Sequence, residues 1–177
     1  DIWPTGPGFE FNLASPIQAH DRACPCDISP LHRWEVRRSK ADVLRRVVEY
    51  GKANGFAVRS MASLREIRPD RTNSAGRPTR FKLFDNEGRS WTLTAEDTRR
   101  ALNHAAPGLA AITRDVRIHS SDFEMRASGG SFVFTGRGFG HGVGMCQFGA
   151  EGGAKRAESA SQILARYYPG ATIEKAY

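Results

Sequence analysis

The sequence lacks several features that would define its class at once. It has only three cysteines in 177 residues, which is too few, and an odd number, for a disulfide scaffold. No run approaches the roughly 18 apolar residues of a membrane-spanning helix. No G-x-x-x-x-G-K-[ST] phosphate loop occurs, and the G-x-G-x-x-G pattern fails because His141 and Met145 stand where its third glycine is required.

The chain also lacks a signal peptide and an initiating methionine, since it begins at Asp1. We therefore expect Asp1 to arise by processing or cleavage, or to be the start of an expressed fragment. A length of 177 residues predicts one domain with a real core. The net charge of +7 fits either a solvated basic surface or an anionic polymer partner, such as nucleic acid or cell-wall glycan.

Glycine is concentrated in residues 136–157 (GRGFGHGVGMCQFGAEGGAKRA), which hold eight of the 18 glycines. The β-type residues before this stretch and the helix formers at its end predict a strand, a tight glycine turn and then a helix. If Gly144, Gly149, Gly152 and Gly153 were all helical, they would cost about 3–4 kcal/mol relative to alanine. We therefore expect another backbone segment, or a ligand, to pack closely against this helix.

The string GRGFGHGVGMCQFGA resembles the C-terminal signature of the stage II sporulation protein D family, also called the amidase-enhancer domain family. The segment 163–170 (ILARYYPG) is similar to that family's closing helix and turn, and residues 80–134 follow its layout loosely. The resemblance implies that residues 1–177 are the C-terminal part of a single such domain. Within it, residues 1–38 form a loop-rich segment with a candidate metal cluster, and residues 39–177 form the sheet and helices. The first part of the domain is expected upstream of Asp1.

The polar and apolar pattern predicts an α+β fold with a mainly antiparallel sheet and three or four short helices. A short strand is expected around residues 34–36, followed by a helix that Ser39 caps. Val43, Leu44, Val47 and Val48 form the apolar stripe of that helix, and its charged residues Arg45, Arg46 and Lys52 are expected on the solvated face.

Further along the chain we expect a strand over 56–67, a polar loop over 68–78 and a hairpin that joins 81–84 to 91–93. Helices are predicted to start at Thr94 and at Ser159, the latter with Gln162 as its capping-box partner. A strand over 132–134 leads into the glycine run, and a short strand is expected at 172–173.

A cluster of thiol and imidazole side chains near the start is a candidate metal site, made of His20, Cys24, Cys26 and His32. Its H-x3-C-x-C-x5-H spacing is not that of a standard zinc finger. Two unrelated cysteines in a loop, a structural zinc site, and pairing with a cysteine outside this chain therefore all stay open. The resemblance implies zinc, because some family members carry a His/Cys cluster at a comparable place. No other cofactor is expected.

The candidate substrate-binding residues lie in the glycine turn and the helix start, where exposed N–H groups can bind sugar oxygens: Gly138, Gly140, His141, Gly142, Gly144 and Gln147. Phe139 and Phe148 are expected to pack inside the protein rather than stack on sugars. Cys146 is expected to pack as well, since no histidine partner is evident that would activate it as a nucleophile. Glu151 is interpreted as an exposed helix residue, and Asp122 as a turn or strand-end residue.

The resemblance implies a lytic transglycosylase of bacterial peptidoglycan, which cleaves MurNAc–GlcNAc bonds without water and leaves 1,6-anhydro ends. In that family a glutamate in the N-terminal part supplies the acid. No matching motif occurs here, so the general acid is expected to be absent from this chain. The expected partners are glycan strands and the missing N-terminal part, in the extracytoplasmic cell envelope. The alternatives are a non-catalytic glycan-binding or amidase-enhancing module and, with no motif in its favour, a nucleic-acid binder.

Overall fold

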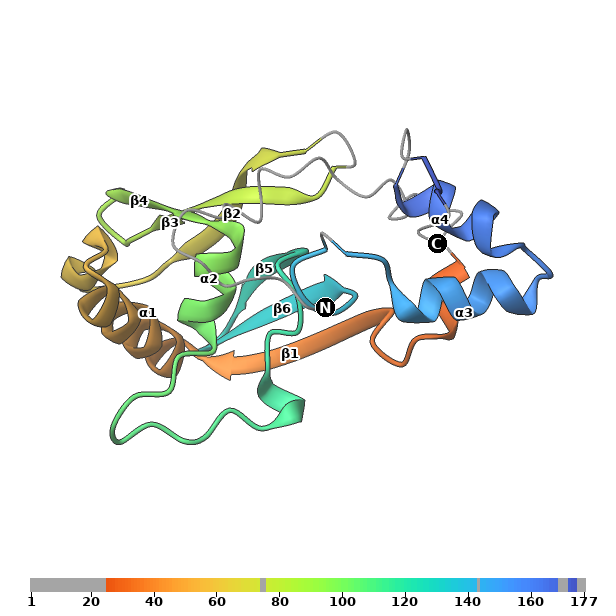
Figure 1. The fold of residues 1–177 in the computed structure, drawn as a ribbon. Helices are drawn as coiled ribbons and strands as arrows, with labels where there is room; N and C mark the ends of the chain where they lie inside the picture. The colour runs from red at the N-terminus through yellow and green to blue at the C-terminus, as the bar shows by residue number, and fades with distance from the viewer. Residues whose placement is uncertain (1–24, 74–75, 143, 169–171, 175–177) are drawn as a thin grey trace.

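The computed structural model describes residues 25–73, 76–142, 144–168 and 172–174. This part of the chain holds four α-helices and two three-stranded antiparallel sheets, which confirms the predicted α+β class (Figure 1). One sheet has the order β1-β6-β5, and the other has the order β2-β3-β4. The strands are β1 (Arg33–Ser39), β2 (Glu66–Thr72), β3 (Pro78–Phe84), β4 (Ser90–Thr94), β5 (Phe123–Ser128) and β6 (Ser131–Arg137), and the helices are α1 (Lys40–Asn54), α2 (Ala95–Leu102), α3 (Gln147–Lys155) and α4 (Ala160–Tyr167).

The first sheet pairs strands that are about a hundred residues apart in the sequence. β1 pairs along its whole length with β6, from Arg33 opposite Arg137 to Ser39 opposite Ser131. β6 is the central strand, and three successive residues of it, Phe132, Val133 and Phe134, are buried. Because successive side chains of a strand point to opposite faces, both faces of β6 are covered at this point. The predicted strand that leads into the glycine run is confirmed.

The second sheet corrects two predictions. Residues 57–60 form a short 3₁₀ turn rather than the start of a strand, and β2 runs through the segment that was predicted to be a polar loop. β2 is paired on one side only, and most of its side chains are at least partly exposed. Polar residues are stable on such an edge strand, so its composition resembles that of a loop. Pro69 fits the same position, because an edge strand tolerates a missing N–H.

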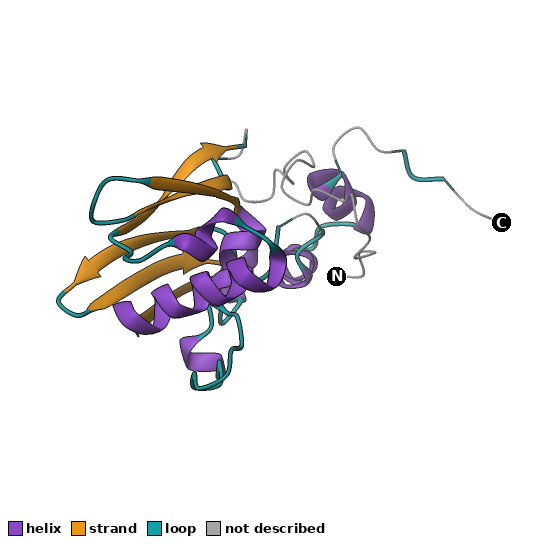
Figure 2. Ribbon diagram, turned by 90° about the vertical axis from the view of Figure 1, so that its left-hand side faces the viewer, coloured by secondary structure: helices purple, strands orange, loops and turns teal. Residues whose placement is uncertain are grey.

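The predicted helix starts and the predicted hairpin are confirmed. Ser39 caps α1 by accepting a hydrogen bond from the Asp42 N–H, and Thr94 caps α2 in the same way. α1 ends at Gly55, whose φ of +74° is a left-handed conformation that glycine adopts readily. β3 and β4 form the expected hairpin across 85–88. α1 and α2 lie side by side and pack against the sheets (Figure 2).

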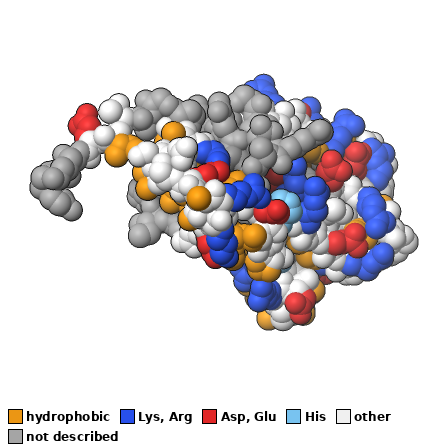
Figure 3. Space-filling model, turned by 90° about the vertical axis from the view of Figure 1, so that its right-hand side faces the viewer, with side chains coloured by type: hydrophobic (Ala, Val, Ile, Leu, Met, Phe, Trp, Pro, Cys, Tyr) orange, Lys and Arg blue, Asp and Glu red, His pale blue; other side chains and the backbone are white. Residues whose placement is uncertain are grey.

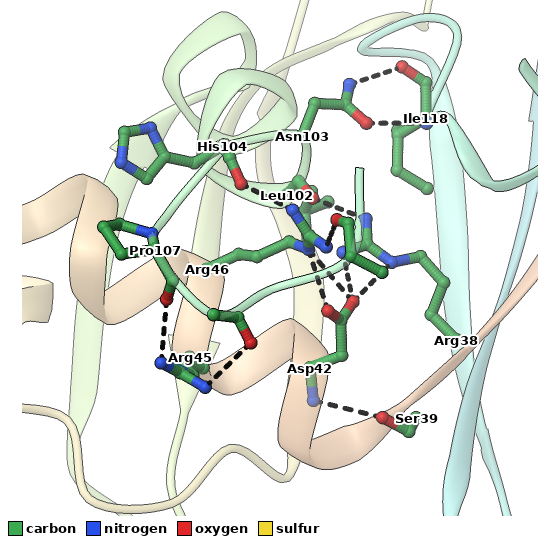
Figure 4. Close-up of polar contacts among 12 residues, drawn as sticks. Arg38, Ser39, Asp42, Arg45, Arg46, Leu102, Asn103, His104, Pro107 and Ile118 are labelled. Atoms are coloured by element: carbon green, nitrogen blue, oxygen red, sulfur yellow. Dashed lines mark hydrogen bonds and ion pairs between the residues drawn. The ribbon is translucent and has the colours of Figure 1, made fainter. Parts of the chain in front are cut away.

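Arg46 corrects the prediction of a solvated face on α1, because its side chain is only 2% exposed. Its guanidinium donates hydrogen bonds to the Asp42 carboxylate and to the carbonyl oxygens of His104 and Ala110 (Figure 4). Arg38 reaches the same carboxylate from β1 and donates to the Leu102 carbonyl. Both arginines are therefore buried with their donors satisfied, and they fix the segment after α2 to α1.

The glycines of α3 are explained by close packing, as the sequence predicts. A side chain at Gly152 would overlap the carbonyl of Pro25, and one at Gly149 would overlap the phenol oxygen of Tyr167. A side chain at Gly153 would come within 2.6 Å of the Glu158 carboxylate. Gly144 lies before the helix in a bend. The free-energy cost of helical glycine therefore applies to three glycines rather than the predicted four.

The final helix, α4, has both hydrogen bonds of the predicted Ser159–Gln162 capping box. Its residues Ile163 and Tyr167 form a small core of their own with neighbours from α3 and the residues just before it. The short strand predicted at 172–173 is wrong. Both of these residues are exposed and take no regular structure, so no buried face stabilises a strand there. Within the described part of the chain, no helix is long and apolar enough to cross a membrane.

Candidate functional site

The glycine turn leaves the end of β6 and alternates its backbone conformation. Gly138, Gly140 and Gly142 have φ values of +68°, +80° and +77°, all in the left-handed region. A side chain is strained in this region, so each of these positions favours glycine on conformational grounds alone. Between the glycines lie Phe139 and His141, whose side chains the turn therefore places in fixed directions.

Hydrogen bonds from three other segments hold the first half of the turn. The Gly138 N–H donates to the Leu31 carbonyl at 2.9 Å, and the Trp34 indole donates to the Gly138 carbonyl at 3.0 Å. The Gly140 N–H donates to the His119 carbonyl at 2.9 Å. These two glycine N–H groups are thus used inside the protein and are not available to a ligand.

Arg77 anchors the turn from the position just before β3. Its side chain is buried, and Nη2 donates to the Gly140 carbonyl at 2.9 Å and to the Ser121 hydroxyl at 3.0 Å. Burial lowers the pKa of the Arg77 guanidinium, whereas the carboxylates of Asp122 and Glu96 act in the opposite direction. A buried cation in this position binds the turn to both sheets at once.

His141 is half-buried at the centre of the turn. Burial lowers the pKa of its imidazole below the ordinary value, and Arg77 and Arg99 lower it further, while Glu96 opposes the shift. The ring is therefore mainly neutral at neutral pH, with one nitrogen that donates and one that accepts. Such a group can hydrogen-bond a sugar hydroxyl in either direction.

Glu96 is a further residue near this site, and its charge acts on both His141 and Arg77. It lies in the first turn of α2, is only 6% exposed, and accepts hydrogen bonds from Arg99 and Arg100. Burial raises the pKa of its carboxyl, but the two arginines outweigh burial and hold the pKa below the usual value. Glu96 therefore stays ionised at neutral pH. The sequence indicates only that Glu96 lies in the first turn of a helix, two residues after the Thr94 cap, and this position alone does not indicate a site.

The remaining predicted residues lie at or before the start of α3. Gly144 is in a bend, and Gln147 is the first residue of α3 with an exposed side chain. Cys146 caps α3, since its sulfur accepts a hydrogen bond from the Gly149 N–H at 3.3 Å, and it packs beside Tyr167. The structure thus agrees with a packing role for this thiol.

The two phenylalanines of the motif correct a prediction, because neither is packed inside. Phe139 is 64% exposed and Phe148 is 41% exposed. The left-handed glycines on either side of Phe139 turn its side chain away from the core, and Phe148 lies on the outer side of a helix whose glycines face inward.

The two carboxylates considered in the sequence have the expected structural surroundings. Glu151 is exposed on α3 and forms an ion pair with Lys155, four residues further along the helix. Asp122 is buried just before β5 and forms an ion pair with Arg137 at 3.2 Å.

Only half of the candidate metal cluster lies in the described part of the chain, since His20 and Cys24 fall outside it. The Cys26 sulfur and His32 Nδ1 are 3.7 Å apart. Two ligands at ordinary zinc distances of about 2.3 and 2.1 Å in a tetrahedral site would be roughly 3.6 Å apart. Cys26 and His32 therefore fit as two ligands of one zinc ion, although no group of three or more potential ligands occurs within the described residues.

Comparison with known proteins places this fold and turn in a family. The family described as Domain of unknown function (DUF8618) matches residues 18–144, which is more than half of the chain, and the chain belongs to this family. The matched range includes the anchored part of the glycine turn from Gly138 to Gly142.

Curated relatives confirm the resemblance to stage II sporulation protein D. The chain is 36% identical to that protein from Bacillus amyloliquefaciens, over 48% of this chain and 28% of the relative. It is 43% identical to that of Bacillus subtilis (strain 168), over 36% of this chain and 20% of the relative. A protein of the same species named amidase enhancer is 48% identical, over 24% of this chain and 6% of the relative. The chain thus matches less than a third of each of these relatives.

Proposed function

We propose that this chain acts on the bacterial cell wall as the glycan-binding part of a peptidoglycan lytic transglycosylase. In that reaction a carboxylic acid protonates the leaving oxygen of a MurNAc–GlcNAc bond, and the C6 hydroxyl of the sugar closes onto C1 to give a 1,6-anhydro end. One carboxyl group that acts first as acid and then as base suffices, because the nucleophile belongs to the substrate. In this proposal, the acid is a glutamate upstream of Asp1, and the protein works in the extracytoplasmic cell envelope.

The observation that supports this proposal most directly is the anchored turn around His141. It combines a neutral imidazole, a rigid backbone and exposed neighbouring side chains, which are features suited to binding a sugar. The carboxylates near the turn are engaged elsewhere: Glu96 with Arg99 and Arg100, and Asp122 with Arg137. This arrangement is consistent with a general acid that is supplied by another segment, while the turn binds the glycan.

A second candidate is a non-catalytic module that binds glycan or enhances an amidase. It is supported by the relative named amidase enhancer. The two candidates share the same glycan site and differ only in whether a catalytic glutamate completes it. A nucleic-acid partner is less well supported, because Lys and Arg side chains alternate with Asp and Glu on the face shown in Figure 3 instead of forming one basic stripe.

The test is a digestion of peptide-free glycan strands, with the products read by mass spectrometry. For this chain alone we expect retention on the glycan without cleavage, and 1,6-anhydro products only when the upstream segment is added. Anhydro products from the chain alone would show that the acid lies within residues 1–177. Retention with no cleavage in either case would favour the non-catalytic module.

His141→Ala tests the site itself, with His104→Ala as the matched control. His104 is a half-buried histidine beyond the end of α2 that meets the Tyr50 ring edge to face and is remote from the turn in sequence. We expect glycan retention to fall for His141→Ala and to remain for His104→Ala. Equal retention by both variants would remove His141 from the site.

A further inference from the structure

Phe139 is an exposed aromatic residue on a rigid support. It is the second residue of the glycine turn, and 64% of its surface is exposed, more than that of any other large hydrophobic residue among those described. A phenylalanine this exposed gains only part of the free energy that full burial of its side chain would contribute. Single exposed apolar residues are common on protein surfaces, so exposure alone assigns no function.

The backbone on both sides of Phe139 is fixed, however. The peptide group before it is held by its carbonyl, which accepts the hydrogen bond from the Trp34 indole. The peptide group after it is held by its N–H, which donates to the His119 carbonyl. With both flanking peptide planes held, the direction of the Cα–Cβ bond of Phe139 is set before any ligand arrives.

The Phe139 ring is also supported from inside the protein. Its centroid lies 6.4 Å from that of His119, at an interplanar angle of 43°, and His119 in turn meets Trp34 edge to face at 5.6 Å. His119 is 5% exposed, and burial lowers its pKa, with Arg117 and Arg114 acting in the same direction. The ring beneath Phe139 is therefore uncharged at neutral pH and is itself braced by a buried indole.

We propose that Phe139 is a stacking platform for a pyranose ring of the glycan, positioned so that polar groups of the same or the next sugar reach His141. This inference rests on the proposed function and deepens it, because it names the residue that binds the apolar face of the sugar. A pyranose ring has C–H groups on its face and hydroxyl groups around its rim, so it suits an isolated aromatic ring with polar neighbours.

The surroundings of Phe139 favour a sugar over an apolar protein partner. Two residues away on one side is His141, and two residues away on the other is Arg137, which is half-exposed and ion-paired with Asp122. A protein-binding patch needs a larger contiguous apolar area than one ring provides. A nucleobase stacks on aromatic rings in the same way, so a nucleic acid is an outcome that the experiment must separate.

The rigid support predicts where the binding energy arises. Because the ring is already oriented, binding loses little side-chain and backbone freedom, and more of the stacking energy contributes to affinity. The shape of the side chain should then matter more than its hydrophobicity. Leucine keeps the apolar character without a flat face, whereas tryptophan keeps and enlarges the face.

The experiment compares Phe139→Leu and Phe139→Trp with the unaltered chain, and uses Phe148→Leu as the matched control for an exposed motif phenylalanine. Affinity is measured for peptide-free glycan strands and for neutral GlcNAc oligomers, at low and high salt. We expect Phe139→Leu to weaken the affinity for both ligands about tenfold. Phe139→Trp should bind at least as tightly as the unaltered chain. Phe148→Leu should bind as tightly as the unaltered chain. A circular dichroism melt checks that each variant is folded like the unaltered chain. We expect this, because Phe139 is exposed and its replacement disturbs no core packing.

The outcomes separate this inference from the proposed function. If the unaltered chain binds glycan and Phe139→Leu binds equally well, the stacking platform is wrong and the proposed function stands. If the unaltered chain binds no glycan, the stacking platform and the proposed function are both wrong. If Phe139→Leu instead loses affinity for a single-stranded oligonucleotide, and that affinity falls with salt, the platform serves nucleic acid and the inference is overturned.

Discussion

Gly142 and Arg77 lie directly against each other. A Cβ at Gly142 would come within 2.5 Å of the guanidinium carbon of Arg77 and within 2.8 Å of its Nε. The same guanidinium holds the Gly140 carbonyl and the Ser121 hydroxyl. Glycine is thus required at position 142 for two reasons. Its backbone is left-handed, and the Arg77 guanidinium occupies the space that a side chain would need.

Gly142→Ala tests this double requirement, with Gly129→Ala as its control. Gly129 also has a left-handed backbone, with a φ of +58°, but a Cβ there would meet nothing within 4 Å. Each substitution has the cost of backbone strain, about 1–2 kcal/mol. Gly142→Ala also displaces Arg77, so we expect its unfolding free energy in urea to be lower than that of Gly129→Ala by at least about 1 kcal/mol. Equal losses would show that Arg77 moves aside freely.

Arg77→Met removes the anchor of the turn, and Arg77→Lys keeps the charge without the second hydrogen bond. We expect Arg77→Met to lower stability by about 1–3 kcal/mol. Arg80→Met, at a partly exposed site three residues further along in β3 with an ion pair at 4.0 Å, should stay within about 1 kcal/mol of the unaltered protein.

The same variants also report on His141. Because the positive charge of Arg77 lowers the pKa of that imidazole, its loss should raise the pKa. The rise should be smaller in Arg77→Lys, which retains the charge. NMR titration of the imidazole protons measures both shifts, and an unchanged pKa in Arg77→Met would contradict the electrostatic effect of Arg77 on His141.

The pair of buried arginines on Asp42 predicts a pH dependence. Burial raises the pKa of the Asp42 carboxyl, but hydrogen bonds from Arg46 and Arg38 outweigh it and hold the pKa below its ordinary value. The carboxylate therefore stabilises the fold above the unfolded pKa of about 3.9, and this stabilisation is lost as the pH falls through the lower folded pKa.

Asp42→Asn should accordingly cost about 3–5 kcal/mol at pH 7, because it leaves two buried cations without their anion. In urea titrations between pH 7 and pH 3, the difference between the unaltered protein and Asp42→Asn should shrink on the acid side. Asp115→Asn, at an exposed site, should unfold like the unaltered protein throughout. A difference that stays constant with pH would refute the assignment.

We also propose that Cys26 and His32 hold a zinc ion together with the predicted ligands His20 and Cys24. Protein purified with zinc should contain about one ion per chain by native mass spectrometry. Cys26→Ser and His32→Ala should lose it, whereas Cys146→Ser, which alters the α3 cap, should keep it. If Cys26→Ser retained zinc, this result would contradict the proposal.

The local signals in the sequence were sufficient wherever neighbouring residues decide the structure. Ser39, Thr94 and Ser159 each cap the helix that they were predicted to cap, because a capping bond is made within four residues. The close packing at Gly149 and Gly152 was likewise foreseen, since helical glycines are costly without such a reason.

Long-range contacts explain what the sequence could not predict. Arg46 has the spacing of a solvated residue, and only its bonds to carbonyl groups about 60 positions away make it a core residue. Arg77 contacts the glycine turn, and the charge of Glu96 acts on His141, only because the tertiary fold brings these segments near one another. No motif near either residue indicates this. β2 resembled a loop because an edge strand needs so little apolar character.

The overlap that a side chain at Gly152 would make with the Pro25 carbonyl has a consequence for how the protein can be divided. Figure 1 shows α3 lying against the short turn Pro25–Ile28, apart from the two sheets. A fragment trimmed to begin at β1 would leave this side of α3 bare, even though every strand remained. The downstream half of the glycine run therefore depends on residues more than a hundred positions earlier, and the shortest piece able to keep its shape includes the segment that bears Cys26.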